Sequence, residues 1–436
     1  MLKKLSLLFT IPELRKKVIF VLALLAVFRV AAAIPLPGVD PERLQQFLAS
    51  NQFFGLLNIF SGGVLENLSI AMLGVGPYIT ASIIMQLLTM IVPRLKELYH
   101  EEGEAGRQKF NQYSRYLTIP LAVLQSYGLL ILLIRQQVIP SPDFFGFAFN
   151  ITIATAGTML LMWLGELITE KGIGNGVSLI IFAGIIASLP SAVWTFILDV
   201  MSLDSAAGAL GRIDPSKLPP YLAFLAVSII VIAGVVIVTE GQRNIPVSYA
   251  KRIRGMRMYG GVSTHLPLRV NQAGVIPIIF AVSIVLFPGL IGSFISGLPN
   301  PAMQDIGNFL VNLFNNQLIY GIVYFVLVFA FTYFYTAVTF EPDSIADNIQ
   351  KQGGFILGIR PGRPTAEYLA RILTRITLAG ALFLGVIAVL PLTVRSVFGI
   401  QSLQLGGTAL LIVVSVVIET VKQIDAQLVM KEYESL

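Results

Sequence analysis

Ten long apolar stretches dominate this 436-residue chain and limit its possible folds more than any other feature. Each is about 17–22 residues long, enough for a helix to cross a hydrocarbon layer roughly 30 Å thick. Charged residues make up 12% of the chain, against roughly 25% in a soluble domain. The sequence therefore predicts an all-α polytopic membrane protein. The expected spans are Val18–Ile34, Leu73–Val92, Tyr116–Ile134, Ile151–Leu167, Val177–Phe196, Tyr221–Thr239, Gly274–Ile295, Ile319–Val338, Ile372–Leu392 and Leu405–Val421.

Lysine and arginine are unevenly distributed among the connecting segments. With the amino terminus inside, the outer segments contain only Arg43, Arg135, Arg212, Lys217 and Arg395 of the 30 basic residues. Since basic loops stay on the cytoplasmic side, both termini are expected there. The first span also resembles a cleavable secretory signal, because basic residues precede it and three alanines lie near its end. Arg29, inside its apolar run, favours a retained span.

An internal repeat links the two halves of the chain. Residues Gly74–Ile79 read GVGPYI, and Gly274–Ile279 read GVIPII. These segments belong to the second span of each set of five, and a duplicated unit with an odd number of spans re-enters the membrane inverted. The prediction is two inverted five-helix halves, 1–216 and 217–436. Chance similarity between isoleucine-rich helices is the alternative.

Longer motifs then identify a family. The segments Met162–Ser178, Ser263–Pro277, Gly358–Thr365 and Gly406–Ile412 resemble signature regions of the SecY family, the central channel subunit of the Sec protein translocon. The resemblance implies a clamshell with an hourglass pore, a lateral gate open to lipid and a re-entrant plug helix. It also implies a channel that passes unfolded polypeptides across a membrane and releases hydrophobic segments, including signal peptides and parts of nascent membrane proteins, into the lipid bilayer.

The resemblance places a narrow apolar ring in the pore. A translocating chain carries unpaired amides that are costly in hydrocarbon, so it needs a watery path. A hydrophobic constriction can dewet and so stop ion leakage when the channel is idle. By similarity the ring consists of Ile79, Ile83, Val177, Ile181, Ile279 and Ile412. Isoleucines in spanning helices otherwise face lipid or pack between helices.

The plug is expected at about residues 53–68, between the first two spans. This segment is apolar and too short to span a membrane, and it includes Phe60, Ser61, Gly62 and Gly63. An amphipathic helix on the outer membrane surface is the alternative.

The resemblance places the lateral gate between spans two and three on one side and spans seven and eight on the other. Gln86, Asn175 and Asn271 are uncharged polar residues expected near it. Bonds between such groups are weak enough for a signal helix to displace. Ordinary contact between helices without a gating role is the alternative.

Two large cytoplasmic loops, about 240–270 and 339–371, contain the expected docking residues. These are Arg243, Lys251, Arg252, Arg254, Arg257 and Arg360. Basic residues suit ribosomal RNA phosphates and equally an acidic motor protein. The resemblance implies the ribosome and the SecA ATPase as partners, SecE and SecG as small membrane subunits, and the bacterial plasma (inner) membrane as the location. A purely topogenic role for these charges is the alternative.

Other classes fit less well. A secondary transporter shares the inverted repeat, but Glu166, Glu240 and Glu419 lie toward the cytoplasmic ends of their spans, and ion coupling usually needs charge at mid-membrane. The histidines, His100 and His265, form no zinc-protease motif, and cysteine is absent. No nucleotide-binding loop followed by Lys-Ser/Thr occurs. The chain is therefore expected to be a non-enzymatic channel subunit without cofactors, driven by a partner.

Overall fold

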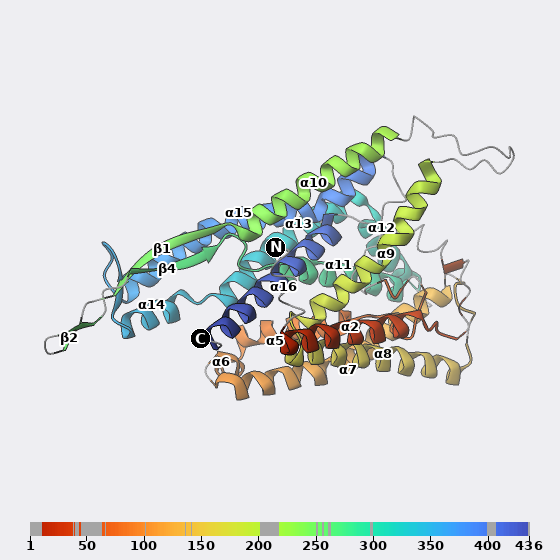
Figure 1. The fold of residues 1–436 in the computed structure, drawn as a ribbon. Coiled ribbons are helices and arrows are strands. Elements are labelled where there is room, and N and C mark those ends of the chain that lie inside the picture. The colour runs from red at the N-terminus through yellow and green to blue at the C-terminus, as the bar shows by residue number, and fades with distance from the viewer. Residues whose placement is uncertain are drawn as a thin grey trace.

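The chain forms an elongated bundle of helices with a small β-region projecting from one end (Figure 1). The computed structural model describes residues 11–37, 39, 43–44, 63–65, 67–100, 102–135, 137–140, 142–200, 218–249, 252–254, 257–259, 263–296, 300–398 and 407–434. Each predicted span overlaps one helix, although several bounds differ. These helices are α2 (Pro12–Ala33), α5 (Gly76–Ile91), α7 (Gly103–Arg135), α8 (Phe144–Lys171), α9 (Gly176–Val200), α10 (Leu218–Glu240), α11 (Ile276–Ile295), α13 (Gln317–Thr339), α15 (Arg363–Phe398) and α16 (Gly407–Glu434).

Several of these helices can cross a membrane on length and composition alone. Within the described residues, the segments that qualify are Gly103–Ile134, Phe144–Lys171, Gln317–Lys351 and Arg363–Val394. Helix α5 and the short α6 (Pro93–His100) meet at a bend of 115° and can form a fifth, broken span. Pro93 begins α6, a position where its missing N–H costs no helical hydrogen bond. Helices α9, α10 and α11 contain shorter apolar segments, of 10–17 residues, among the residues described.

Helix packing in the first half is repeated in the second. In the first half, α2 contacts α8 and α9, α5 contacts α7, and α8 contacts both α7 and α9. In the second half, α10 contacts α15 and α16, α11 contacts α13, and α15 contacts both α13 and α16. The two sets match when helices are paired in chain order. The halves meet where α9 packs on α16 and where α11 packs on α5 and α7.

The two large loops between helices share one antiparallel sheet. Strand β1 (Gln242–Tyr249) lies between β4 (Ser263–Arg269) and β5 (Gly354–Ile356), and β2 (Arg252–Arg254) pairs with β3 (Arg257–Tyr259) at the tip. Ile245 and Val247 alternate with exposed neighbours and pack on an apolar cluster that includes Leu369 of α15. This period-two burial is typical of a sheet with one covered face. The sheet therefore fixes both loops to the same end of the molecule.

Two further amphipathic helices complete the fold. Helix α12 (Pro301–Asn315) follows α11, and α14 (Pro342–Lys351) follows α13. Helix α14 packs on α15 beside the sheet, whereas α12 lies at the opposite end of the molecule (Figure 1).

Candidate functional site

The second helix of each half begins with the same backbone turn. Gly74 and Gly274 have φ values of +59° and +63°, which glycine adopts without steric cost. Helices α5 and α11 begin two residues later, each with proline in second place. Between glycine and helix, Val75 and Val275 are both buried in one large apolar cluster. The repeat seen in the sequence is therefore also a repeat of backbone conformation and of burial.

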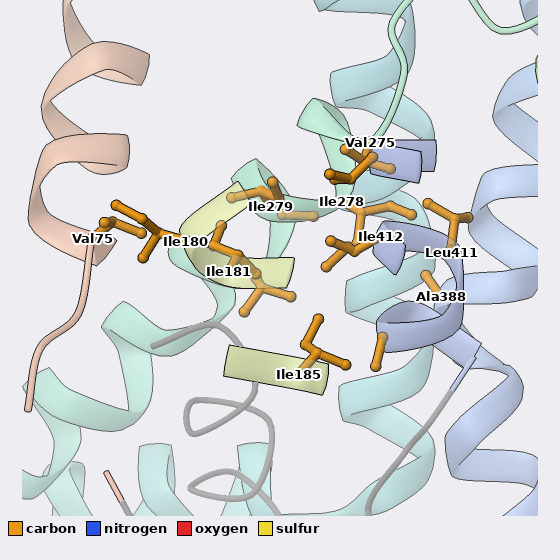
Figure 2. Packing of buried hydrophobic residues seen from close by; sticks show 14 of the residues in the cluster. Val75, Ile180, Ile181, Ile185, Val275, Ile278, Ile279, Ala388, Leu411 and Ile412 are labelled. Atoms are coloured by element: carbon orange, nitrogen blue, oxygen red, sulfur yellow. The ribbon is translucent and has the colours of Figure 1, made fainter. Parts of the chain in front are cut away.

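That cluster, called the central cluster below, joins the two halves and contains three of the six expected ring residues. Ile181, Ile279 and Ile412 are 0%, 7% and 1% exposed, and they belong to α9, α11 and α16 respectively. Figure 2 shows their side chains pointing toward one another. Ile79 of α5 and Val177 of α9 are partly buried and pack against the same cluster.

Ile83 differs from the other expected ring residues. Its side chain is 2% exposed, but it lies outside the central cluster as far as the described residues show. Ile185, which was not expected, belongs to the cluster (Figure 2). It follows Ile181 by four residues and so lies on the same face of α9. The four-residue spacing from Ile181 could therefore have predicted that Ile185 lies in the same cluster.

The segment before α5 is buried among helices of the first half. Of the expected plug residues, Phe60, Ser61 and Gly62 lie outside the described residues, and Gly63 is described. A side chain at Gly63 would be in van der Waals contact with the carbonyl oxygen of Gly184 on α9. The next residue, Val64, is 0% exposed and belongs to the central cluster.

Backbone pairing holds the end of this segment in place. The N–H of Leu36 donates to the oxygen of Leu68 at 2.9 Å, and the N–H of Ile70 donates to the oxygen of Ile34 at 2.9 Å. A side chain at Gly157 of α8 would overlap the carbonyl oxygen of Ile70. From Gly63 to Val75 the described residues form turns instead of a helix. The chain therefore returns along the end of α2 before α5 begins.

The three expected gate residues have different environments. The Asn271 side chain donates to the carbonyl oxygen of Gly274 at 3.1 Å and so braces the turn before α11. Its Oδ1 atom and the Oε1 atom of Gln86 are buried without a hydrogen-bond partner in the described structure. Asn175 is exposed, and its Oδ1 accepts from the N–H of Ser178 at 3.2 Å at the start of α9. Gln86 and Asn271 therefore each have a buried acceptor without a partner in the described structure, whereas Asn175 caps a helix.

An ion pair also crosses between the halves. Lys96 Nζ of α6 lies 3.1 Å from Glu341 Oε1, at the junction of α13 and α14. The other carboxylate oxygen of Glu341 accepts from Ser344 Oγ at 2.9 Å. The serine therefore holds the acidic side chain of the second half in position for the lysine of the first half.

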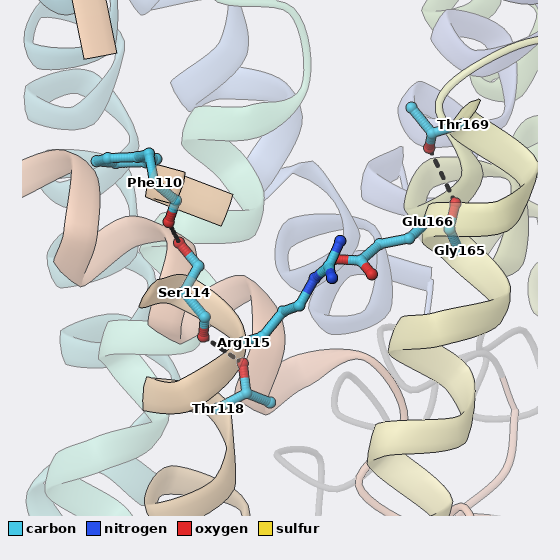
Figure 3. Close-up of polar contacts among 7 residues, drawn as sticks. All are labelled: Phe110, Ser114, Arg115, Thr118, Gly165, Glu166 and Thr169. Carbon is cyan, nitrogen blue, oxygen red and sulfur yellow. Dashed lines mark hydrogen bonds and ion pairs between the residues drawn. The ribbon is translucent and has the colours of Figure 1, made fainter. Parts of the chain in front are cut away.

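The turn between α8 and α9 explains one of the sequence motifs. Arg115 Nε of α7 lies 2.7 Å from Glu166 Oε1 of α8, and the Glu166 side chain is only 18% exposed (Figure 3). Thr169 donates to the oxygen of Gly165 at 2.9 Å (Figure 3) and accepts from the N–H of Gly176 at 2.9 Å. A side chain at Gly176 would overlap the carbonyl oxygen of Gly165. The motif thus fixes three helices of the first half at one end.

The far end of α16 contacts the same turn from the second half. Gln423 Oε1 accepts from the N–H of Gly174 at 2.7 Å, and Gln427 Oε1 accepts from Lys17 Nζ of α2 at 3.4 Å. Leu14 and Ile173 pack with Ile424 and Leu428 of α16 beside these bonds. The two halves are therefore joined by a second set of contacts in addition to the Lys96–Glu341 pair described above.

The expected docking residues lie at the β-containing end. Arg243 is exposed on β1, and Arg360 is exposed in the loop that follows β5. Because β5 pairs with β1, both arginines belong to loops joined by one sheet. Arg252, Arg254 and Arg257 lie on the β2–β3 hairpin, where only the backbone is described, and Lys251 lies outside the described residues.

Comparisons with known proteins agree with this arrangement. The SecY family model matches residues 69–421. The protein translocase subunit SecY of Streptomyces galbus is 46% identical, over 98% of this chain and 97% of that protein. A solved SecY structure, whose plug domain stabilises the closed channel and maintains a membrane seal, matches with a TM-score of 0.63 at 20% identity, covering 93% of this chain and 90% of that one. Sec61 in a canine ribosome–channel complex matches with a TM-score of 0.60 at 18% identity and the same coverage. The chain belongs to the SecY family.

Proposed function

We propose that this chain is a protein-conducting channel in which unfolded polypeptides pass between two inverted halves, residues 1–216 and 217–436. The central cluster carries the proposal, because it gathers buried aliphatic side chains from α9 in the first half and from α11 and α16 in the second. The matched helix contacts of the two halves support the inverted repeat. We further propose that all ten long helices span the membrane.

The central cluster serves as the closed seal of the pore. Aliphatic side chains offer water no hydrogen bond, so a constriction lined by them dewets and blocks ions. They also make no directional bonds to a passing chain, and they can part around side chains of any chemistry. In this proposal Ile79, Ile83, Val177, Ile181, Ile279 and Ile412 form the ring that opens.

The plug rests against this ring from one side. Val64 packs in the central cluster, and the backbone bonds of Leu36 and Ile70 anchor the segment that follows it. In this proposal the plug comprises about residues 53–68, with Phe60, Ser61, Gly62 and Gly63. Val64 would leave the cluster when a polypeptide enters, while the bond from Ile70 to Ile34 keeps the chain after the plug beside α2.

The lateral gate opens where α11 separates from α5 and α7. Gln86 lies on α5 and Asn271 just before α11, and each has a buried acceptor without a donor in the described structure, which supports a gate closed by few strong polar bonds. Lys96 and Glu341 close the same side nearer the β-containing end. Asn175 would contribute to the gate indirectly, by capping the start of α9. A hydrophobic signal helix can therefore replace helix–helix contacts without breaking a strong polar network.

The β-containing end faces the cytoplasm and its partners. It contains the basic loops and the last described residues of α16, which supports a positive-inside orientation with both termini in the cytoplasm of a bacterial inner membrane (Figure 1). Arg243, Lys251, Arg252, Arg254, Arg257 and Arg360 then form one docking region for SecA and the ribosome. SecE and SecG accompany the chain, and the energy for transport comes from the bound partner.

Crosslinking from single cysteines tests the channel directly, because the natural chain has none. An arrested secretory polypeptide should crosslink to cysteines at Ile79, Ile181 and Ile279. Control positions are available about one and a half turns away, on the opposite faces of two helices. Ile186 of α9 is 40% exposed, five residues after Ile181, and Val417 of α16 is 44% exposed, five residues after Ile412. Equal crosslinking of ring and control positions would show that the polypeptide does not pass through this cluster.

A further inference from the structure

Helix α12 presents an apolar edge that no described part of the chain covers. Met303, Ile306 and Phe309 are 45%, 55% and 64% exposed. Their spacing of three residues places them as neighbours along one side of the helix. Three polar residues, Asp305, Asn308 and Asn312, are exposed on another side. Helix α12 is therefore amphipathic, and part of its apolar surface is not covered by the described residues.

The inner side of α12 is fixed to α11 at close range. A side chain at Gly307 would overlap the backbone N–H of Ser296 and lie 2.6 Å from the oxygen of Gly292 on α11. Leu310 and Val311 border the same crossing, and Phe314 packs against the central cluster. Backbone meets backbone here, so α12 cannot rotate to cover its exposed edge.

The next helix in the chain, α13, also has an exposed apolar stripe. A single residue, Asn316, separates α12 from α13. Its side chain caps α13 by accepting from the N–H of Leu318 at 3.0 Å. Leu318, Ile322 and Val326 of α13 are 69%, 57% and 56% exposed and four residues apart. Such a stripe on a spanning helix faces hydrocarbon. In the sequence, the exposed edge of α12 comes shortly before Leu318, the first residue of this stripe.

Charge limits the kind of surface that α12 contacts. Residues 296–318 contain no lysine or arginine, and Asp305 is their one acidic residue. Interfacial helices that bind anionic headgroups have basic residues on the polar side. Attraction of α12 to a membrane must therefore come from the burial of apolar side chains.

We propose that α12 is an interfacial helix, with Met303, Ile306 and Phe309 inserted into the acyl boundary of the outer leaflet and Asn308 and Asn312 facing water. Because α12 packs backbone to backbone on α11, the proposed gate helix and this lipid-held helix move together. The proposal rests on the membrane crossing of α11 and α13 in the proposed function. It does not require transport of polypeptides.

Spin labels on single cysteines test the position of α12. The full-length chain is reconstituted in vesicles of phosphatidylethanolamine, with and without phosphatidylglycerol. Collision rates with oxygen, which concentrates in hydrocarbon, are compared with those of a water-soluble nickel chelate. Labels at Ile306 and Phe309 should show an oxygen-to-nickel ratio several-fold higher than a label at Asn308. The ratio should be the same with and without the anionic lipid.

Two reference positions separate the possible failures. A label at Ile322 of α13 reports hydrocarbon if the spans are correct, and a label at Arg243 of β1 reports water. Nickel access at Ile306 together with hydrocarbon at Ile322 would overturn the proposal for α12 alone. Loss of both collision partners at Ile306 would also overturn it, because a protein and not lipid would then cover the edge. Nickel access at Ile322 would instead contradict the membrane topology.

Discussion

Lys96 Nζ lies 3.1 Å from Glu341 Oε1, and this ion pair joins the first half of the chain to the second. Both side chains are partly exposed, at 52% and 38%. Exposed pairs contribute about 1 kcal/mol or less, so this contact can bias the proposed lateral gate toward its closed state without locking it. Gln86 of α5 and Asn271, just before α11, have unpaired acceptors in the described structure.

Reversing one charge of this pair should favour the open gate. Lys96→Glu or Glu341→Lys replaces attraction by repulsion, and up to about 1 kcal/mol corresponds to about fivefold in the equilibrium. The expected result is up to about fivefold more export of a precursor with a defective signal sequence. The double reversal should return export toward the original level.

A pair within the first half provides the control. Lys109 Nζ lies 3.9 Å from Glu102 Oε2, with both side chains exposed. Lys109→Glu changes the same charge without touching the contact between halves, and it should leave signal-independent export unchanged. If both lysine variants increase that export alike, net charge is responsible and Lys96 does not hold the gate.

Alanine at Gly274 should destabilise the protein through backbone conformation alone. The residue has φ +63°, and an added Cβ would meet no atom within 4 Å. The left-handed conformation costs a residue with a side chain about 1–2 kcal/mol.

Gly128→Ala in α7 is the matched control, since a side chain there also meets no atom within 4 Å, and alanine is favoured over glycine inside a helix. Thermal unfolding in detergent should show a lower midpoint for Gly274→Ala and an equal or higher one for Gly128→Ala. A lowered midpoint in both would contradict the role of the turn.

Arg115→Ala should cost stability because it leaves Glu166 unpaired in a poorly hydrated position. The Glu166 side chain is 18% exposed, and a buried group without its partner costs about 1–3 kcal/mol. The exposed pair Arg363–Glu367, at 89% and 65% exposure, offers a comparison. Arg363→Ala should change the unfolding midpoint much less than Arg115→Ala. Equal effects would mean that the Arg115–Glu166 bond does not brace α7 against α8.

Charge reversal at Arg360 should weaken partner binding. Arg360→Glu and Arg243→Glu place acidic groups in loops that one sheet joins, so both should reduce binding of SecA and of ribosomes in a salt-dependent way. Lys351, exposed at the end of α14, controls for net charge. Lys351→Glu should have the smaller effect on binding. If all three reversals weaken binding equally, the loops act only through their total charge.

The sequence predicted the helices well because hydrophobic length is a local property. It placed the start of the ninth span at Ile372, whereas α15 begins at Arg363, and it ended the tenth at Val421, whereas α16 continues to Glu434. Hydropathy marks the apolar run, but a helix continues into polar residues as long as its backbone bonds and caps are satisfied. The turn shared by Gly74 and Gly274 was visible because both glycines precede the same Val-X-Pro pattern.

Contacts between distant residues were not predictable from one sequence. Lys96 and Glu341 are 245 positions apart, and surface charges of both signs occur throughout the loops. The β-sheet was missed for the same reason, since β1 pairs with β5 from another loop. Alternation at Ile245 and Val247 gave a local signal for β1 but none for its partners. The expected ring came from family resemblance and stays a prediction. It includes Ile83, which lies outside the central cluster as far as the structure is described, and does not include Ile185, which belongs to the cluster.

Ion flux through the resting channel tests the central claim most directly. Serine in place of Ile181, Ile279 or Ile412 brings a hydrogen-bonding group into the cluster, whereas Ile186→Ser changes an exposed residue of the same α9 helix. Vesicles containing equal amounts of folded protein are compared for ion leakage without a substrate. We predict increased leakage and altered export for the three cluster variants and unchanged values for Ile186→Ser. If the cluster variants are as tight and as active in export as the original chain, these side chains do not form the seal.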